Sequence, residues 1–339
     1  MEYFKFLYKT QPSIEINLTS KKHNSFKHIT KDNKIKEYPT FYDNDEISGN
    51  IELKLNKNKS LIYEYVSINL YGMLFINSGK SKIETEIYKE SQELTGKKSP
   101  DIITNEITTF SFNFTPKIKP YETYIGNIIQ IKYYIKAIIR TNNINSPPLI
   151  EKEMEIACLK PEKKIICDEI YFKGNNKIEI NIGVENVIHV RLNLLKTKYF
   201  LDDVIIGKIT IIKSEIELNN IYMKIIKEEK YYQLDDIIVK NEDLTNYEIA
   251  EGFIEQGDQI YFKYFLKNIK NLTPSYDYKE NNKNKISVKY YLCFCFNDSQ
   301  DYEFFKYIEI NIYRMNICDM VKEENKFISL KKLMKDNDK

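Results

Sequence analysis

The feature that most constrains the fold is a strict alternation of apolar and polar residues, most regular between Ile129 and Arg140. Over this stretch every second side chain is apolar, and most positions between them are polar. Because successive side chains of a β-strand point to opposite faces, the pattern predicts a strand with one face on a core. The same period recurs in four further segments, at residues 51–55, 178–182, 221–225 and 308–312. Many half-buried strands joined by polar loops are typical of antiparallel β-sandwiches.

Two short patterns occur twice in the chain, at nearly the same separation. Residues 45–51 and 203–209 both read Asp-x-Ile-x-Gly-x-Ile, and residues 129–135 match residues 286–292 in their order of residue types. The glycine of the first pattern is expected to permit a bulge or a close backbone approach, with an ordinary turn glycine as the alternative. The repeat predicts two copies of one β-sandwich.

The length of the chain also fits two domains. Its 339 residues exceed the roughly 100 to 200 residues of one typical domain. We therefore expect a first domain at residues 1–160, a second at residues 161–316, and a charged, flexible tail at residues 317–339. Two polar segments, residues 80–105 and 227–246, show no clear period and are predicted to be long loops.

Charge and hydropathy exclude several classes of protein. Lys and Arg total 51 against 49 Asp and Glu, which is too balanced to indicate a nucleic-acid-binding protein. No stretch approaches the roughly 18 uninterrupted apolar residues of a membrane span. The five cysteines, an odd number, are expected to be reduced thiols. These features predict a cytoplasmic protein and leave open its recruitment to a membrane surface.

The sequence motifs indicate no catalytic residue, metal site or cofactor. Residues 79–81 read Gly-Lys-Ser, but Leu74 stands where a phosphate-binding P-loop needs glycine. Cys293 and Cys295 share one face of a predicted strand, where packing is favoured over metal ligation. We therefore predict a protein that is not an enzyme. The alternative from another class is an enzyme whose site forms between the two sandwiches.

Several blocks of sequence resemble the vacuolar protein sorting 26 family, the arrestin-like subunits of the retromer complex. The blocks that carry the resemblance are residues 41–43, 119–126, 182–189, 198–209, 246–252, 286–292 and 305–314. The resemblance runs from about Ser13 to Arg314 and implies two tandem arrestin-like, immunoglobulin-type β-sandwich domains. It implies a non-enzymatic adaptor that captures cargo tails for retrieval from endosomes to the Golgi or the plasma membrane. An arrestin-domain subunit of a related sorting complex, or a receptor-tail arrestin, is the alternative.

The resemblance also implies partners and a location. Members of the family bind the large helical-solenoid subunit of retromer and help a sorting nexin to hold the cytosolic tails of membrane cargo. They associate peripherally with endosomal membranes and contain no transmembrane segment. No nucleic acid and no cofactor are implied.

Two sets of residues match the family's binding positions. Tyr247, Ile249 and Ala250 resemble the segment that meets the solenoid subunit, with Ile249 expected to be exposed and Ala250 standing where the family has Met. Ile182 and Phe305 match the apolar floor of a groove for cargo and a sorting nexin. We expect Phe305 to be exposed, because it shares the strand parity of Tyr307 and opposes the apolar residues 308, 310 and 312.

Overall fold

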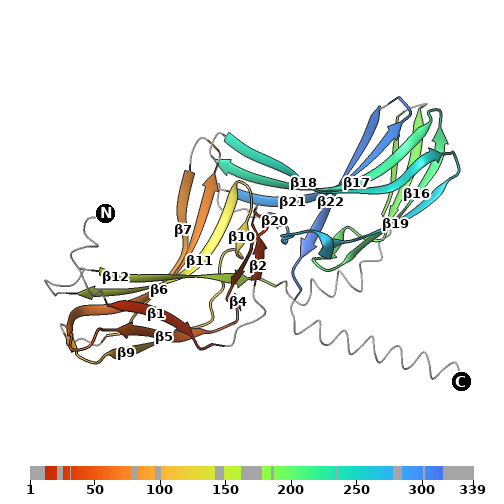
Figure 1. Ribbon diagram of the computed structural model, residues 1–339. Coiled ribbons are helices and arrows are strands. Elements are labelled where there is room, and N and C mark those ends of the chain that lie inside the picture. The colour runs from red at the N-terminus through yellow and green to blue at the C-terminus, as the bar shows by residue number, and fades with distance from the viewer. Residues whose placement is uncertain are drawn as a thin grey trace, which may run out of the picture. The chain divides into compact units, whose positions relative to one another are not determined.

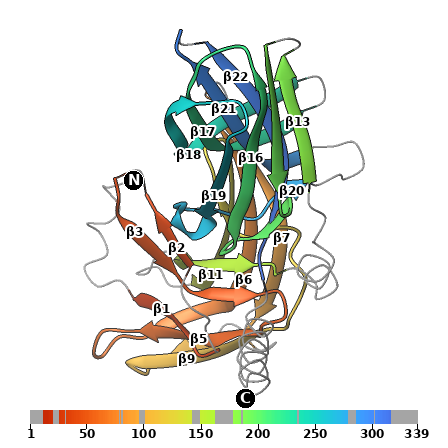
Figure 2. The same ribbon diagram turned by 90° about the vertical axis from the view of Figure 1, so that its right-hand side faces the viewer.

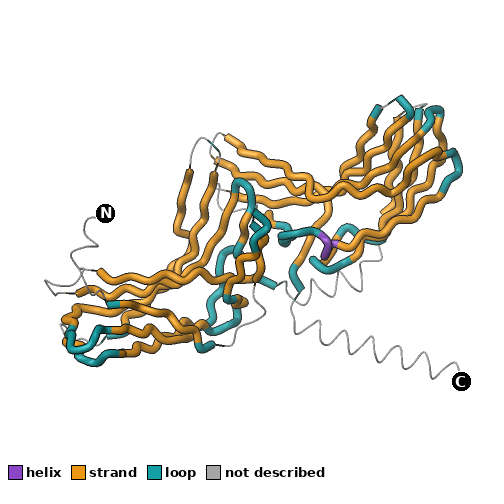
Figure 3. The backbone as a smooth tube through the Cα atoms, in the orientation of Figure 1, coloured by secondary structure: helices purple, strands orange, loops and turns teal. Residues whose placement is uncertain are grey.

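The computed structural model describes residues 12–20, 26–30, 32–77, 79, 82–95, 101–141, 149–161, 178–184, 187–233, 236–277, 285–300 and 302–315. The chain divides into two compact units, Met1–Lys160 and Pro161–Lys339, which are described separately (Figure 1). Nearly all of the described elements are strands, and a three-residue 3-10 helix, η2 (Leu266–Asn268), is the only helix among them (Figure 3). The all-β prediction is therefore confirmed. The predicted tail at residues 317–339 lies outside the described residues.

The first unit contains three sheets. The smallest is a two-stranded sheet of β2 (Phe26–Ile29) and β3 (Ile35–Tyr38). A three-stranded sheet has the order β1 (Ser13–Leu18), β5 (Ile47–Lys54), β9 (Ile107–Phe114). A seven-stranded sheet has the order β4 (Thr40–Tyr42), β12 (Leu149–Leu159), β11 (Ile129–Thr141), β6 (Leu61–Asn77), β7 (Lys82–Glu93), with β10 (Tyr124–Ile125) paired to β11 and β8 (Asp101–Ile103) paired to β6.

The second unit contains two sheets. A four-stranded sheet has the order β13 (Ile178–Val184), β14 (Ile188–Leu194), β16 (Val204–Ser214), β19 (Gln259–Phe265). A six-stranded sheet has the order β15 (Lys198–Phe200), β22 (Glu303–Tyr313), β21 (Lys285–Asp298), β17 (Leu218–Gln233), β18 (Asp236–Ile254), with β20 (Tyr276–Asp277) paired to β21. Figure 2 shows these two sheets face to face at the top of the view.

Each unit buries the apolar face of its alternating strands. In β11 and β5 every second residue is buried, including Ile135 and Leu53. In the second unit Ile209 of β16 and Leu292 of β21 are fully buried. Because the buried set follows the period of two, the strand predictions at residues 51–55, 129–140, 178–182, 221–225 and 308–312 are confirmed. The hydrophobic cores thus lie between the paired sheets.

The predictions of two long loops, at residues 80–105 and 227–246, are wrong. Strands β7 (residues 82–93) and β8 (residues 101–103) lie within residues 80–105, and the β17–β18 hairpin runs through residues 227–246. Both β7 and β18 are end strands of their sheets. The residues of β7 alternate between exposed and half-buried, so neither face gives the apolar period that marks a core strand. Backbone hydrogen bonds to one neighbour and partial packing hold these strands, and a hydropathy pattern does not record either.

The internal repeat is present in the structure as equivalent strands. Residues 45–51 lead into β5, and residues 203–209 lead into β16. Directly before each of these strands is a turn that is capped by an aspartate. Asp45 accepts a hydrogen bond from the backbone N–H of Tyr42, and Asp203 accepts one from that of Phe200 at 2.7 Å. The strands before these turns, β4 and β15, pair in parallel with β12 and β22. The same turn therefore links equivalent strands in both units.

The repeated glycine permits a close backbone approach, as expected, and it is not an ordinary turn glycine in either copy. Gly49 and Gly207 lie within regular strand pairings, without a register shift at either residue. A β-carbon at either position would meet a backbone oxygen of one neighbouring strand and a phenylalanine ring of the other. The partners are Asn17 and Phe112 for Gly49, and Asn193 and Phe262 for Gly207. The glycines thus let a ring lie directly over the strand.

A buried tyrosine in β11 supplies a test of unit 1. The hydroxyl of Tyr133 donates a hydrogen bond to the backbone oxygen of Tyr121 at 2.7 Å, and the side chain is fully buried. We expect Tyr133→Phe to lower the free energy of unfolding by about 1 kcal/mol, because it removes one buried hydrogen bond. Urea unfolding measures the change. Tyr134→Phe is the control, since Tyr134 stacks on Tyr71 through its ring, at 5.3 Å between centroids; an equal loss in both variants would contradict the assignment.

Candidate partner-binding surfaces

The residues predicted to meet a solenoid subunit lie near the end of β18. This strand is the end strand of the six-stranded sheet, and β17 is its neighbour. The pairing runs from Ile221 with Ala250 to Tyr222 with Glu248, so Ile249 is the extra residue of a β-bulge. Bulges on edge strands re-aim side chains and interrupt pairing. Ile249 is half-buried, so it is less exposed than expected, yet it is not a core residue.

Tyr247 fixes this segment against the second sheet. Its ring packs edge-on against Tyr264 of β19, with 5.3 Å between centroids and 64° between ring planes. Edge-to-face packing of this kind holds two aromatic side chains in a defined orientation. The contact places β18 and β19 on the same side of the sandwich. Tyr247 therefore has a structural role in the sandwich, and because it is only half-buried, part of its side chain stays accessible.

An exposed phenylalanine next to this segment was not found from the sequence. Phe253 is 68% exposed and stands between Gly252 and the buried Ile254. Gly252 has a φ of 100°, a conformation that favours glycine. The alternation with Ile254 was the signal that could have identified Phe253. Phe253 lies four residues after Ile249 on the same strand, and an exposed aromatic side chain there is a further candidate for partner contact.

The second predicted set lies at the opposite side of the sandwich. Since β18 and β19 are on one side, the sheet orders put β13 and β22 on the other; both strands are seen in Figure 2. Strand β13 is an end strand, and β15 pairs with β22 only at residues 311–313. In the described residues, the rest of that edge of β22 has no strand partner. Two strand edges on this side are thus unpaired in the part of the chain that the structure describes.

The predicted groove residues differ in exposure. Phe305 is 45% exposed and Tyr307 is 56% exposed, whereas Ile308 and Ile310 are buried, in agreement with the expected parity. Ile182 is only 9% exposed, and it pairs in register with the buried Val190. An apolar surface on this side would therefore be formed mainly by β22. The assignment of Ile182 and Phe305 to a cargo groove stays a prediction.

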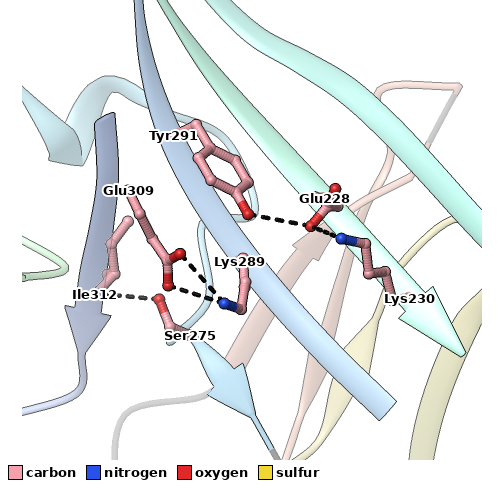
Figure 4. A network of polar contacts seen from close by, with 7 residues as sticks. All are labelled: Glu228, Lys230, Ser275, Lys289, Tyr291, Glu309 and Ile312. Carbon is pink, nitrogen blue, oxygen red and sulfur yellow. Dashed lines mark hydrogen bonds and ion pairs between the residues drawn. The ribbon is translucent and has the colours of Figure 1, made fainter. Parts of the chain in front are cut away.

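Polar contacts span the outer face of the six-stranded sheet (Figure 4). The Tyr291 hydroxyl donates to Glu228 at 3.2 Å, and Glu228 pairs with Lys230 at 2.7 Å. Lys289 contacts both carboxylate oxygens of Glu309, at 3.1 and 3.2 Å. Desolvation, and then the charge of Glu228, raise the pKa of Tyr291 to about 12. These groups satisfy one another and connect β17, β21 and β22, so they form a structural network.

The two cysteines of β21 lie on the same sheet face, as predicted. Cys293 and Cys295 are both buried, with 3.7 Å between sulfur atoms, and both are free thiols. A hydrogen bond from Cys295 lowers the pKa of Cys293 to about 7. Within the described ranges, no group of three or more His, Cys, Asp or Glu side chains could hold a metal ion. The pair is consistent with the expected packing role.

No helix in the part of the chain that the structure describes is long and apolar enough to cross a membrane.

The sequence matches the family described as Vacuolar protein sorting-associated protein 26 over residues 8–301. It is 29% identical over 317 residues to Vacuolar protein sorting-associated protein 26B of Mus musculus and to that of Homo sapiens; each alignment covers 93% of this chain and 88% of the relative. The Danio rerio protein of the same name is also 29% identical, with 93% of this chain and 89% of the relative covered. Because the family match includes most of both β-sandwich units, this chain belongs to the vacuolar protein sorting-associated protein 26 family.

Proposed function

We propose that this chain is the arrestin-like adaptor subunit of a retromer-type coat on endosomal membranes. It binds the large helical-solenoid subunit of that coat and acts without catalysis. The observation that carries the proposal is the family match over residues 8–301, which includes strands of both sandwiches. A match confined to one sandwich would support an arrestin-like fold and nothing more specific.

The end of β18 is the proposed contact with the solenoid subunit. Tyr247, Ile249 and Ala250 are half-buried there, and Phe253 is exposed. A half-buried isoleucine at a bulge keeps part of its apolar surface available to a partner while its backbone stays anchored. Burial of the remaining surface contributes to binding through the hydrophobic effect.

Affinity purification of the tagged full-length chain from its native cell, followed by mass spectrometry, tests the proposal. We expect a large protein predicted to be an α-helical solenoid to be recovered in near-stoichiometric amount. The tag alone is the control for non-specific capture. Recovery of a different large partner in its place would support an arrestin-domain subunit of another sorting complex and would displace the proposal. Recovery of the chain alone would also count against it.

The open edge of β22 is the proposed contact with cargo. An extended cargo tail can pair with an exposed strand edge, while exposed side chains beside it select apolar residues of the tail. Phe305, 45% exposed, is the apolar side chain best placed for that selection. Ile182 contributes less, because only 9% of it is exposed. A sorting nexin would complete the groove.

Phe305→Asp tests the cargo contact. We expect the variant to keep its fold and its solenoid partner but to bind a cargo tail in the presence of a sorting nexin at least about tenfold more weakly, because a charge replaces an apolar anchor. Fluorescence anisotropy of a labelled tail peptide measures the loss. Tyr302→Asp is the matched control, since Tyr302 is 63% exposed and directly precedes the same strand. Unchanged tail binding by folded Phe305→Asp would place the groove elsewhere.

A further inference from the structure

The outer face of the four-stranded sheet carries exposed apolar and cationic side chains at paired positions of β16 and β19. Ile206 pairs across the strands with Lys263, and Lys208 pairs with Tyr261. The residue between them in each strand, Gly207 in β16 and Phe262 in β19, is buried and faces the core. Directly opposed side chains on one face of an antiparallel pair are close neighbours. The two types of side chain therefore alternate within one continuous surface.

The apolar members of this surface are unusually exposed for their type. Tyr261 is 73% exposed, Ile206 is 42% exposed and Phe265 is 37% exposed. Leu195, 45% exposed, extends the surface beyond β14, where its N–H donates to the backbone oxygen of Ile206. We define these four residues, together with Lys208, Lys263 and Lys267, as the β16–β19 patch. Exposed apolar side chains gathered on one face mark an interaction site more often than scattered ones do.

The cations of the patch have no carboxylate partner within ion-pair distance among the described residues. Lys263 and Lys267 both lie over the ring of Phe265, with 5.9 and 5.5 Å from nitrogen to ring centroid, and Lys208 lies 5.7 Å over Tyr261. Lys208 also hydrogen-bonds the side chain of Gln259 at 3.5 Å. Stacking on a ring supports each lysine stem but leaves its positive charge uncompensated. The patch therefore presents net positive charge around apolar groups.

On the opposite half of the same sheet face, formed by β13 and β14, the charged side chains are paired. Arg191 of β14 pairs with Glu179 of β13 at 3.0 Å, and Asn193 donates to the same carboxylate at 3.3 Å. Its exposed polar groups thus compensate one another within the sheet. The uncompensated cations lie toward β19, beside the exposed aromatic rings. This asymmetry indicates a ligand that covers only the β19 side of the face.

We propose that the β16–β19 patch docks on an anionic lipid surface. The match is one of charge and of polarity: lysine ammonium groups attract acidic headgroups, and exposed tyrosine, phenylalanine and isoleucine side chains enter the boundary between headgroups and acyl chains. Tyrosine is suited to that boundary because its ring is apolar and its hydroxyl is polar. A protein interface would instead gather its apolar side chains into a centre depleted of charge, whereas here lysines are interleaved with them.

Co-sedimentation of the purified full-length chain with vesicles tests the docking. We expect binding to phosphatidylcholine vesicles that contain phosphatidylserine, little binding to phosphatidylcholine alone, and weakening as salt rises. Lys263→Glu/Lys267→Glu should lower partitioning by on the order of a hundredfold, since each lysine near the surface contributes to attraction and each glutamate is repelled. Tyr261→Ser should lower it several-fold by removing interfacial apolar area. Circular dichroism checks the fold of each variant.

Two matched controls separate the patch from overall charge. Lys57→Glu/Lys59→Glu makes the same charge change at two exposed residues in a loop of the other unit, and Tyr302→Ser removes a ring that is 63% exposed. Both should bind vesicles like the wild type. Equal loss in the patch and control variants, or no vesicle binding by the wild type, would overturn the proposal. Loss of the solenoid partner by Lys263→Glu/Lys267→Glu, with vesicle binding intact, would identify the patch as a protein interface instead.

The vesicle experiment is independent of the proposed adaptor function. It uses the chain alone, and no solenoid subunit or sorting nexin is present. Failure of vesicle binding would leave the partner recovered by affinity purification unaffected. Failure to recover a solenoid partner would likewise leave a positive vesicle result in place.

Discussion

Ile249→Asp is expected to weaken binding of this chain to its solenoid partner by about a hundredfold while changing the melting temperature little. The expectation rests on the proposed contact at the end of β18. Burial of an isoleucine side chain contributes roughly 1.5 to 3 kcal/mol, and an unpaired carboxylate in the interface adds a desolvation cost. Because Ile249 is the unpaired residue of a bulge, its replacement leaves the regular β17–β18 pairing on either side in place.

Ile237→Asp is the matched control for this variant. Ile237 lies on the same edge strand and is 60% exposed, whereas Ile249 is half-buried, so the chemical change is identical but the two sites differ in position and exposure. Isothermal titration calorimetry with the purified solenoid subunit measures both affinities. We expect Ile237→Asp to bind like the wild type. If folded Ile249→Asp also binds with wild-type affinity, the contact does not include the bulge.

The strands with one buried face could be predicted from the sequence alone. In β11 and β22 burial follows the residue period directly, because a core on one side imposes apolar residues at every second position. The exposure of Phe305 followed from the same period. The repeated Asp-x-Ile-x-Gly-x-Ile pattern predicted equivalent strands, and β5 and β16 are equivalent down to the ring that covers each glycine.

The end strands, and the second half of β17 beside the end strand β18, could not be predicted in this way. In β17 the face that carries Met223 and Ile225 continues with Lys227 and Glu229. Both are buried, and 3.3 Å separates the Lys227 Nζ from a carboxylate oxygen of Glu229. Charged residues on a buried face break the apolar period, so the pattern resembles a loop although the backbone pairing continues. The bulge at Ile249 has the same effect on its own strand. It shifts the parity of the following residues, so a period of two carried through from Tyr247 does not give the exposure of Phe253.

The β16–β19 patch also could not be predicted from the sequence. Lys263 and Ile206 are far apart in the chain and become neighbours only through strand register. The absence of an ion-pair partner for a lysine among the described residues is likewise a property of three-dimensional placement. Sequence composition gave a formal net charge of only +2. A nearly neutral chain can therefore carry a local positive surface without any sign of it in the total charge.

Gly49→Ala is expected to have the largest effect on stability, lowering the free energy of unfolding of unit 1 by about 3 kcal/mol. The added β-carbon would overlap the backbone oxygen of Asn17 and lie 2.8 Å from the ring of Phe112. A backbone oxygen in a paired strand cannot rotate away, so β1 must shift relative to β5, and forced overpacking costs about 1 to 3 kcal/mol. Hydrogen–deuterium exchange of peptides from β1 and β5 would localise the loss to that sheet.

Gly207→Ala should cost less, about 2 kcal/mol, and part of that cost should be recoverable. The β-carbon at Gly207 would overlap mainly with the ring of Phe262, while the backbone oxygen of Asn193 lies 2.9 Å away. Phe262→Leu shortens the side chain that causes the main overlap. The double variant Gly207→Ala/Phe262→Leu is therefore expected to be less destabilised than the sum of its single changes, by roughly 1 kcal/mol in a double-mutant cycle measured by urea unfolding. The equivalent pair Gly49→Ala/Phe112→Leu should show a smaller coupling, because the backbone oxygen of Asn17 remains in the way. Simple additivity at Gly207 would show that backbone approach, and not the covering ring, is what requires glycine in both copies of the repeat.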